Sequence, residues 1–351
     1  MTRQKKITAV LLCLLAIVVV VLVVIWSQFG GRAQIYESES YAMGTYIQQT
    51  VYGKNGQAAA TAAAQAVTKL ENQISWRVES SDIARLNDAA GTTWEGIDPE
   101  TTKLLSLALE VAQKSGGAFD PTVLPLTSLW RMESDNPHVP TDAELKNALQ
   151  YVGYSDLRVN TDENTASLRR HYEGIDLGAL GKGAACDTVE SIYQQYKLTA
   201  GVIAAGGSIG VYGTKPDGTN WLIAVRDPKT SDDAVGSIGT IQLENGEFVS
   251  TSGPYEKNFT QNGKTYHHLL NPKTGMPENN GLVSVSVVCK NGALSDALST
   301  ACFILGKDKG AALAESYQAD ILFVEENGKV TASAGMQERF QLTNHSYSMS
   351  S

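Results

Sequence analysis

The chain has 351 residues and a formal net charge of −9, with 28 lysines and arginines against 37 aspartates and glutamates. This acidic balance argues against a nucleic-acid partner, which would require a basic face. The length and a hydrophobic content of 42% are sufficient for one large domain or two domains with an ample core.

The N-terminal residues predict a membrane anchor. Residues 1–6 are basic, and the uncharged apolar run over residues 7–26 is about as long as a bilayer-spanning helix requires. A cleaved signal peptide would have a shorter apolar core, and most of the run follows Cys13, the candidate for lipidation. Because basic flanks stay in the cytoplasm, we expect a single-pass protein of the cell membrane, with residues 27–35 as a linker and the rest of the chain extracytoplasmic.

Residues 36–342 are expected to form the main folded region, which mixes helices and strands. In chain order, we expect a strand over 38–53, helices over 57–75 and 99–117, a loop and short helix within 132–154, a helix over 182–198, strands over 200–213, 221–228, 236–253 and 282–289, a helix over 294–306 and a hairpin over 319–333. Because strands and helices do not alternate regularly, the predicted class is α+β, with mixed or antiparallel sheets and packed helices. The stretch around 120–160 could form a small subdomain, and the polar tail, residues 343–351, is expected to be disordered.

Two glycine-containing stretches are suited to a ligand that carries phosphate. Residues 174–187, GIDLGALGKGAACD, place three glycines around Lys182 before a helix, and free N–H groups at a helix start favour anions. The spacing is not that of a P-loop, and a plain loop-to-helix junction is the alternative. Residues 116–126, GGAFDPTVLPL, are either a helix cap with an Asp-Pro turn or a backbone that lies against a flat ligand, with Phe119 packed on it.

Two further segments carry side chains suited to catalysis. His267 and His268 precede an Asn-Pro turn, and adjacent strand residues face opposite ways, so one of them could be a base near a phosphate and the other a core or solvated histidine. Asp296 and Thr300 lie four residues apart, on one face of the predicted helix. Either Ser295 caps this helix with Asp296 in its first turn, or the carboxylate and hydroxyl are hard oxygen ligands for Mg²⁺.

The ordered set of motifs resembles the FAD:protein FMN transferase family, also called ApbE-like. The resemblance covers about residues 36–342 and rests on the stretches YAMGTYI, SDIARLN, SGGAFDPTVLPLTSLW, DLGALGKGAACD, AAGGSIGVYG, TSGPYEKNF, YHHLLNPKTGMP and SDALSTACFILG. Each motif is weak alone, but their order along one chain is specific.

The resemblance implies an enzyme that binds FAD and Mg²⁺, cleaves the pyrophosphate, releases AMP and attaches FMN through a phosphoester to a Thr or Ser hydroxyl of a target protein. It implies that the metal is held by Asp296, Thr300 and the backbone carbonyl of Ala179. It assigns the family histidine to His268, which could supply the base that a weakly nucleophilic hydroxyl needs. The implied contacts to FAD are Met43, Gly117, Ala118, Phe119, Asp176, Lys182 and Leu270.

The chain departs from the family pattern at Asn271, where the family usually has Asp before the proline of the histidine motif. An aromatic contact of the family could align with either Trp76 or Arg77. No stretch of the type D-x-x-[ST]-G-A-[ST], which the family modifies, occurs in the chain, so the acceptor is expected to be another protein, such as a membrane electron-transfer subunit. The alternatives are a Mg²⁺-dependent FAD pyrophosphatase and a flavin-binding protein without activity.

Overall fold

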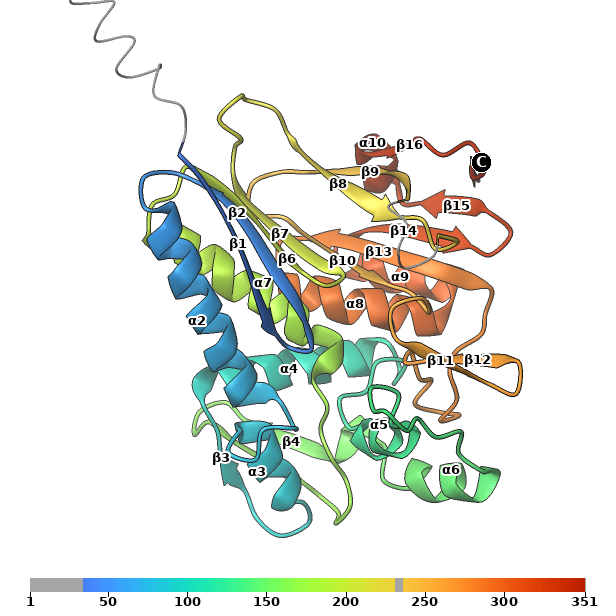
Figure 1. Ribbon diagram of the computed structural model, residues 1–351. Helices are drawn as coiled ribbons and strands as arrows, with labels where there is room; N and C mark the ends of the chain where they lie inside the picture. Colours follow the sequence, from blue (N-terminus) through green and yellow to red (C-terminus); the bar gives the residue numbers. More distant parts are fainter. Residues whose placement is uncertain (1–33, 231–235, 351) are drawn as a thin grey trace, which may run out of the picture.

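A large antiparallel sheet forms the centre of the protein. The structure is a computed structural model that describes residues 34–230 and 236–350. Within these residues, the largest sheet has nine strands, antiparallel except for the pair β15 and β17 (Figure 1). Their order across the sheet is β1 (Ile35–Ala42), β2 (Thr45–Tyr52), β6 (Ala200–Ala205), β7 (Ser208–Gly213), β10 (Phe248–Ser252), β13 (Leu282–Cys289), β14 (Asp320–Glu325), β15 (Lys329–Ala332) and β17 (Ser348–Met349).

Helices and smaller sheets surround this sheet. The helices are α2 (Gly56–Ile74), α3 (Asp82–Asp88), α4 (Pro99–Lys114), α5 (Leu124–Trp130), α6 (Asp142–Leu149), α7 (Gly178–Gln195), α8 (Gly292–Leu305), α9 (Lys307–Ser316) and α10 (Ala334–Arg339), with a 3₁₀ turn at Tyr154–Asp156. The smaller sheets are the hairpin β11 (Asn258–Gln261) and β12 (Lys264–His267), the group β16 (Phe340–Leu342), β9 (Ser237–Leu243) and β8 (Trp221–Arg226), and the group β3 (Glu95–Gly96), β5 (Thr165–Leu168) and β4 (Leu157–Asn160).

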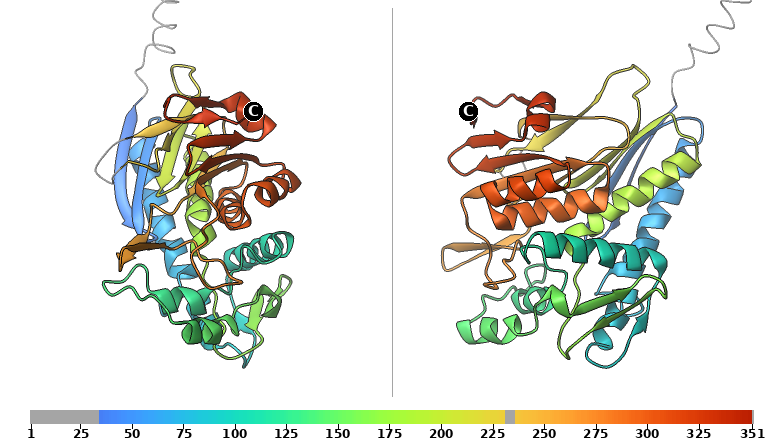
Figure 2. Two further views of the ribbon diagram at one scale, coloured as in Figure 1. Left: turned by 90° about the vertical axis from the view of Figure 1, so that its right-hand side faces the viewer. Right: turned by 180° about the vertical axis from the view of Figure 1, so that it is seen from behind.

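The large sheet is buried on both faces. Because side chains alternate along a strand, Val287 packs into the core with α2, α7 and α8, whereas Val288 packs into the core with β8 and β9. Seen from behind, α7 and α8 lie across the sheet (Figure 2). In the lower part of Figure 1 lie α3 to α6, of which α5 and α6 share a separate cluster around Leu126 and Leu145. The predicted α+β class with antiparallel sheets and packed helices is confirmed.

Three sequence predictions need correction. The strand expected over residues 38–53 is a hairpin, because Met43 and Gly44 turn the chain between β1 and β2. The tail is not disordered up to residue 350, because β17 pairs with β15 and Tyr347 is only 4% exposed. The glycine-rich stretch is not a loop before α7, because Gly178 is already the first residue of that helix. The predicted anchor, residues 7–26, lies outside the described residues; among those described, no helix is long and apolar enough to cross a bilayer.

Candidate active site

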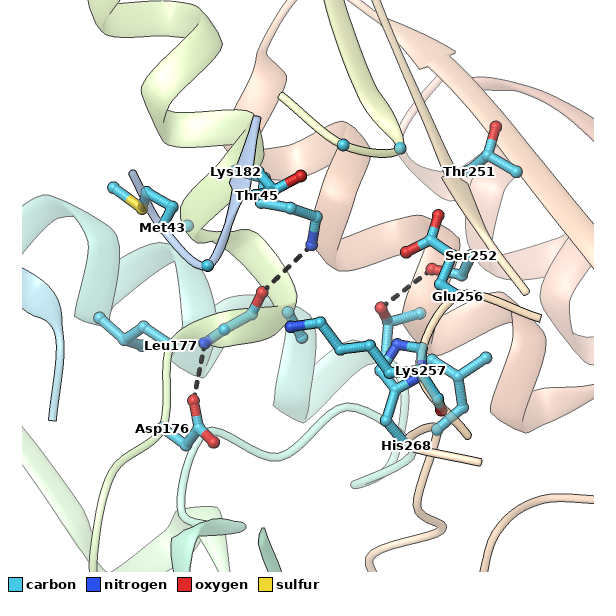
Figure 3. A pocket seen from close by; sticks show the side chains of 18 of the residues that line it. Met43, Thr45, Asp176, Leu177, Lys182, Thr251, Ser252, Glu256, Lys257 and His268 are labelled. Atoms are coloured by element: carbon cyan, nitrogen blue, oxygen red, sulfur yellow. Dashed lines mark hydrogen bonds between the residues drawn. The ribbon is translucent and has the colours of Figure 1, made fainter. Parts of the chain in front are cut away.

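A cavity of about 830 Å³ lies between the hairpin β1–β2, the start of α7 and the segment before β11 (Figure 3). Its volume is in the range of pockets that hold cofactor-sized ligands. Most of the residues predicted to form the site line it: Met43, Ala118, Phe119, Asp176, Ala179, Lys182, His268, Leu270 and Thr300. The remaining two adjoin residues of this lining: Gly117 precedes Ala118, and the Asp296 carboxylate lies 3.7 Å from Lys182 Nζ.

A tight turn places Met43 in the cavity. Met43 and Gly44 connect β1 to β2 and have φ values of 55° and 69°, as a two-residue type I′ hairpin requires. A positive φ is unusual for methionine, and the Glu71 carboxylate of α2 holds the turn by accepting a hydrogen bond from the Met43 N–H at 2.9 Å. The hairpin tip is therefore fixed against α2 and presents the Met43 side chain to the ligand space.

The start of α7 supplies a cation to the cavity. Asp176 Oδ1 accepts a hydrogen bond from the Gly178 N–H at 2.8 Å, which fixes the entry into the helix. One turn later, Lys182 Nζ lies 3.5 Å from the Gly178 carbonyl oxygen and points into the cavity (Figure 3). Burial alone would lower the pKa of Lys182, but Asp296, Glu256 and Glu133 outweigh it and raise the pKa. A protonated lysine at a helix start suits phosphate oxygens.

Asp296 lies beneath this lysine. Its Oδ1 is 3.7 Å from Lys182 Nζ, and its Oδ2 accepts a hydrogen bond from the Gly183 N–H at 3.0 Å. Burial raises the pKa of Asp296, although Lys182 and the Gly183 N–H act in the opposite direction. The capping alternative is wrong, because α8 begins at Gly292 and its cap is Asn291, so Asp296 lies beyond the first turn.

The oxygen atoms near Asp296 fit a Mg²⁺ ion. Thr300, one turn further along α8, faces the cavity and its Oγ1 lies 3.2 Å from Ser252 Oγ. In a regular helix the Gly183 N–H would donate a hydrogen bond to the Ala179 carbonyl oxygen. Here Asp296 Oδ2 accepts from the same N–H, so the two oxygen atoms compete for one donor. Among the described residues, no three His, Cys, Asp or Glu side chains are grouped to hold a metal. One carboxylate with a hydroxyl and a carbonyl suits Mg²⁺, which takes hard oxygen ligands and completes its shell with water and phosphate.

His268 faces the same cavity from the base of the hairpin β11–β12. Its backbone N–H donates to the Lys257 carbonyl at 3.0 Å, and its ring Nδ1 lies 3.2 Å from the same oxygen. A carbonyl can only accept, so Nδ1 carries the proton and Nε2 keeps a free lone pair. Burial, with Lys182 and Lys257, lowers the pKa of His268 to about 3, so the ring is neutral near pH 7.

His267 does not share this role. Its Nε2 donates to the Glu278 carbonyl at 2.9 Å, and its ring packs edge-on against Phe303 at 6.0 Å between centroids. The prediction that the two histidines face different surroundings is confirmed: His267 is half-buried against Phe303, and His268 lies at the cavity.

Similarity to known proteins shows the family of this chain. The ApbE family model matches residues 43–323. The chain belongs to the ApbE family. It is 31% identical over 333 residues to the FAD:protein FMN transferase of Treponema pallidum, an alignment that covers 89% of this chain and 91% of the relative. A second FAD:protein FMN transferase, from Klebsiella pneumoniae, is 30% identical over 90% of this chain and 96% of its own length.

Solved structures of the ApbE family have the same fold. The ApbE protein of Thermotoga maritima superposes with a TM-score of 0.80 at 31% identity, covering 87% of this chain and 99% of that one. The flavin transferase ApbE of Vibrio cholerae gives a TM-score of 0.76 at 26% identity, covering 88% and 100%.

At Asn271, this ApbE-family chain compensates for the missing aspartate. Asn271 Oδ1 accepts from the Lys273 N–H at 2.9 Å, which preserves the turn that an aspartate would make. Its Nδ2 donates to Glu278 Oε2 at 2.6 Å. An aspartate here would place its own carboxylate against that of Glu278, so Asn271 and Glu278 form a compatible pair.

Several further residues line the cavity, and the sequence left their roles open or unassigned. Trp76 and Arg77 both line it, with the guanidinium 4.2 Å from the indole centroid. The Trp76 Nε1 is buried without a hydrogen-bond partner, so it can donate to a ligand. The stretch TSGPYEKNF carried the resemblance but no assigned role, although its adjacent Glu256 and Lys257 were a signal of charge near a turn.

Proposed function

We propose that this protein transfers FMN from FAD to a Thr or Ser hydroxyl of an acceptor protein through a phosphoester bond, with Mg²⁺ as the metal and AMP as the second product. Flavin transfer follows from its place in the ApbE family. The observation that best supports the detailed chemistry is that one cavity holds a cation at a helix start, Lys182, and a neutral imidazole with a free Nε2, His268.

The proposed reaction is a displacement at phosphorus. The acceptor oxygen forms a bond to the phosphorus of the FMN half, and the bond between that phosphorus and the bridging oxygen of the pyrophosphate breaks, so AMP leaves with that oxygen. His268 Nε2 takes the proton of the acceptor hydroxyl. Lys182, in the first turns of α7, holds phosphate oxygens and stabilises their charge.

Asp296, Thr300 and the Ala179 carbonyl would hold the metal on the side of the cavity where α7 and α8 meet. When bound, Mg²⁺ would neutralise the pyrophosphate and the charge that develops on the leaving AMP. Asp296 supplies the negative charge of this set, and the Gly183 N–H orients its carboxylate.

The test uses the full-length protein, FAD, Mg²⁺ and a peptide of the type D-x-x-[ST]-G-A-[ST]. AMP release with an FMN adduct on the peptide, detected by intact mass, is the expected result. AMP with free FMN in the presence of the peptide would identify a pyrophosphatase instead. FAD binding without AMP release would identify a flavin-binding protein.

We also propose that residues 7–26 anchor the protein in the cell membrane with the catalytic region outside the cytoplasm, where a membrane electron-transfer subunit would be the acceptor. The basic residues 1–6 before an uncharged run support this orientation. Protease added to intact cells should degrade the catalytic region. Its full protection until the cells are lysed would contradict the orientation.

A further inference from the structure

His268 depends on a carbonyl that belongs to another segment. Lys257 directly precedes β11 and His268 directly follows β12, so the two residues face each other at the base of the hairpin. The Lys257 carbonyl accepts both the backbone N–H and the ring Nδ1–H of His268, at 3.0 and 3.2 Å. A shift of Lys257 would therefore release the ring and allow the other tautomer.

Glu133 holds Lys257 in place by its side chain. Glu133 lies in the segment after α5, far from the hairpin in sequence, and its Oε1 is 2.5 Å from Lys257 Nζ. Its other oxygen, Oε2, lies 3.2 Å from Arg77 Nη2 in the segment after α2. Three separate segments that line the cavity are thus joined at one carboxylate. Burial would raise the pKa of Glu133, but Lys257 and Arg77 outweigh it and lower the pKa, so the carboxylate is ionised.

Packing around Trp130 makes this contact more than a mobile surface pair. Trp130, at the end of α5, is fully buried and donates from Nε1 to the Gly275 carbonyl at 2.7 Å. Its ring lies 5.4 Å from that of Tyr266 in β12 and 6.5 Å from that of Phe259 in β11. The hairpin is therefore fixed to α5 by an aromatic cluster on one side and by Glu133 beside the cavity.

We propose that Glu133 is a positioning residue for His268: its carboxylate ties Lys257 to Arg77 and so holds the Lys257 carbonyl that keeps the imidazole Nε2 free toward the cavity. This inference rests on the proposed function for its kinetic consequences, but the state of the imidazole is independent of it. Exposed ion pairs usually stabilise little, so the contribution of Glu133 should appear in the rate rather than in the fold.

The kinetic test compares Glu133→Gln, Lys257→Met and the double variant in single-turnover FMN transfer at saturating FAD. Each single variant should slow transfer roughly tenfold, since a shift of about 1 Å in a catalytic group can cost up to about 100-fold, while the Kd for FAD stays unchanged. The double variant should be no slower than either single variant, because both act through the same contact. In the His268→Ala background, Glu133→Gln should cause no further slowing.

Glu325→Gln is the matched control, because it breaks a pair of similar geometry between Lys307 and Glu325, at 2.9 Å, away from the cavity. Its transfer rate should equal that of the wild type. If Glu133→Gln weakens FAD binding and leaves the rate at saturation unchanged, Glu133 contacts the substrate and the inference is wrong. Additional slowing in the His268→Ala background would also overturn it.

A second measurement does not need transfer activity. Side-chain ¹⁵N NMR of histidine-labelled full-length protein, with the His268 signal assigned by its loss in His268→Ala, reports which ring nitrogen is protonated. The wild type should show the proton on Nδ1, and Glu133→Gln should show exchange between both tautomers. An unchanged Nδ1 tautomer in Glu133→Gln would overturn the inference even if FMN transfer is confirmed. If the wild type shows no FMN transfer, the NMR measurement still tests whether Glu133 positions the His268 ring.

Discussion

Gly183 of α7 and Gly292 of α8 pack backbone against backbone. A Cβ atom added to Gly183 would lie 2.0 Å from the Gly292 carbonyl oxygen, and one added to Gly292 would lie 2.4 Å from the Gly183 carbonyl oxygen. The Asp187 carboxylate reinforces the contact by accepting from the N–H groups of Gly292 and Ala293 at 2.6 and 2.8 Å. This close approach places Lys182 beside Asp296, so the helix crossing builds the proposed metal site.

Gly183→Ala should push the two helices apart. The added methyl group would meet backbone atoms, which cannot rotate away, so we expect a loss of about 1–3 kcal/mol of unfolding free energy or more and loss of FAD cleavage. Gly181→Ala, in the same helix, is the control for stability. Its Cβ would meet nothing closer than 3.6 Å, so stability should be equal or greater by up to about 1 kcal/mol. Denaturant unfolding of both variants measures the difference, and equal stability would contradict the contact.

Asp296→Asn should abolish FAD cleavage without unfolding the protein. The amide keeps an oxygen for the Gly183 N–H but removes the charge that the metal needs. Burial raises the pKa of Asp296, so removing this charge recovers its desolvation cost. This gain offsets the lost pairing with Lys182 at 3.7 Å, and the protein should stay folded. A rise in Tm on adding Mg²⁺ with FAD should occur in the wild type and disappear in the variant.

Asp187→Asn is the matched control for loss of a buried carboxylate between α7 and α8. Burial raises the pKa of Asp187 to about 6, and its two backbone hydrogen bonds support the start of α8. This variant should lose stability yet keep the Tm shift with Mg²⁺ and FAD. Wild-type turnover by Asp296→Asn at low Mg²⁺ would show that Asp296 is not a metal ligand.

His268→Ala should slow FMN transfer by roughly 10²- to 10⁴-fold, the usual loss for a general base. Because the pKa of His268 is lowered to about 3, wild-type transfer should show no acid limb near pH ~6.5, where a solvated imidazole titrates. The pH profile of single-turnover transfer measures this. His267→Ala should lose stability, through its Glu278 bond and Phe303 contact, but retain the rate. Equal rate loss in both variants would indicate local unfolding instead of base catalysis.

The same pKa shift predicts a pH dependence of stability. The pKa of His268 in the folded protein lies below the unfolded value of about 6.5, so the neutral ring contributes stability that is fully present above that pH. This contribution is lost as the pH falls from about 6.5 toward 3. The Tm of His268→Ala should therefore fall less on acidification than that of the wild type, and parallel curves would contradict the shift.

Local patterns predicted most of the elements and many of the residues at the cavity. Apolar spacing located α2 and α4, and Asn-Gly turns located the closing hairpin of β14 and β15. The distinction between His267 and His268 followed from strand alternation. The order of weak motifs then linked Met43 to a cavity whose other walls come from residues far away in the chain.

What could not be predicted depends on contacts between distant segments. The sequence groups Gly183 with the glycines around Lys182 that suit a phosphate, but its small size serves the contact with Gly292, which only the packing of α7 on α8 reveals. Glu133 looked like one charge in a polar loop, because its partners Arg77 and Lys257 are 56 and 124 positions away by residue number. The capping interpretation of Asp296 failed because the helix begins at Gly292, three residues before Ser295.

The C-terminal tail is polar, which suggested disorder, but its side chains make buried contacts that hold it against the fold. Asp227 is 7% exposed, and it accepts hydrogen bonds from the Tyr347 hydroxyl and from Asn344 Nδ2, the latter at 3.0 Å. Tyr347→Phe leaves this buried carboxylate short of a donor, so we expect a loss of about 1–3 kcal/mol in denaturant unfolding. Tyr172→Phe is the control, since Tyr172 is 78% exposed and should change stability little.

Deletion of residues 344–351 should lower the unfolding free energy more than Tyr347→Phe does, because both hydrogen-bond donors to Asp227 and the pairing of β17 with β15 are lost. A truncated protein as stable as the full chain would show that the tail does not contribute to the fold.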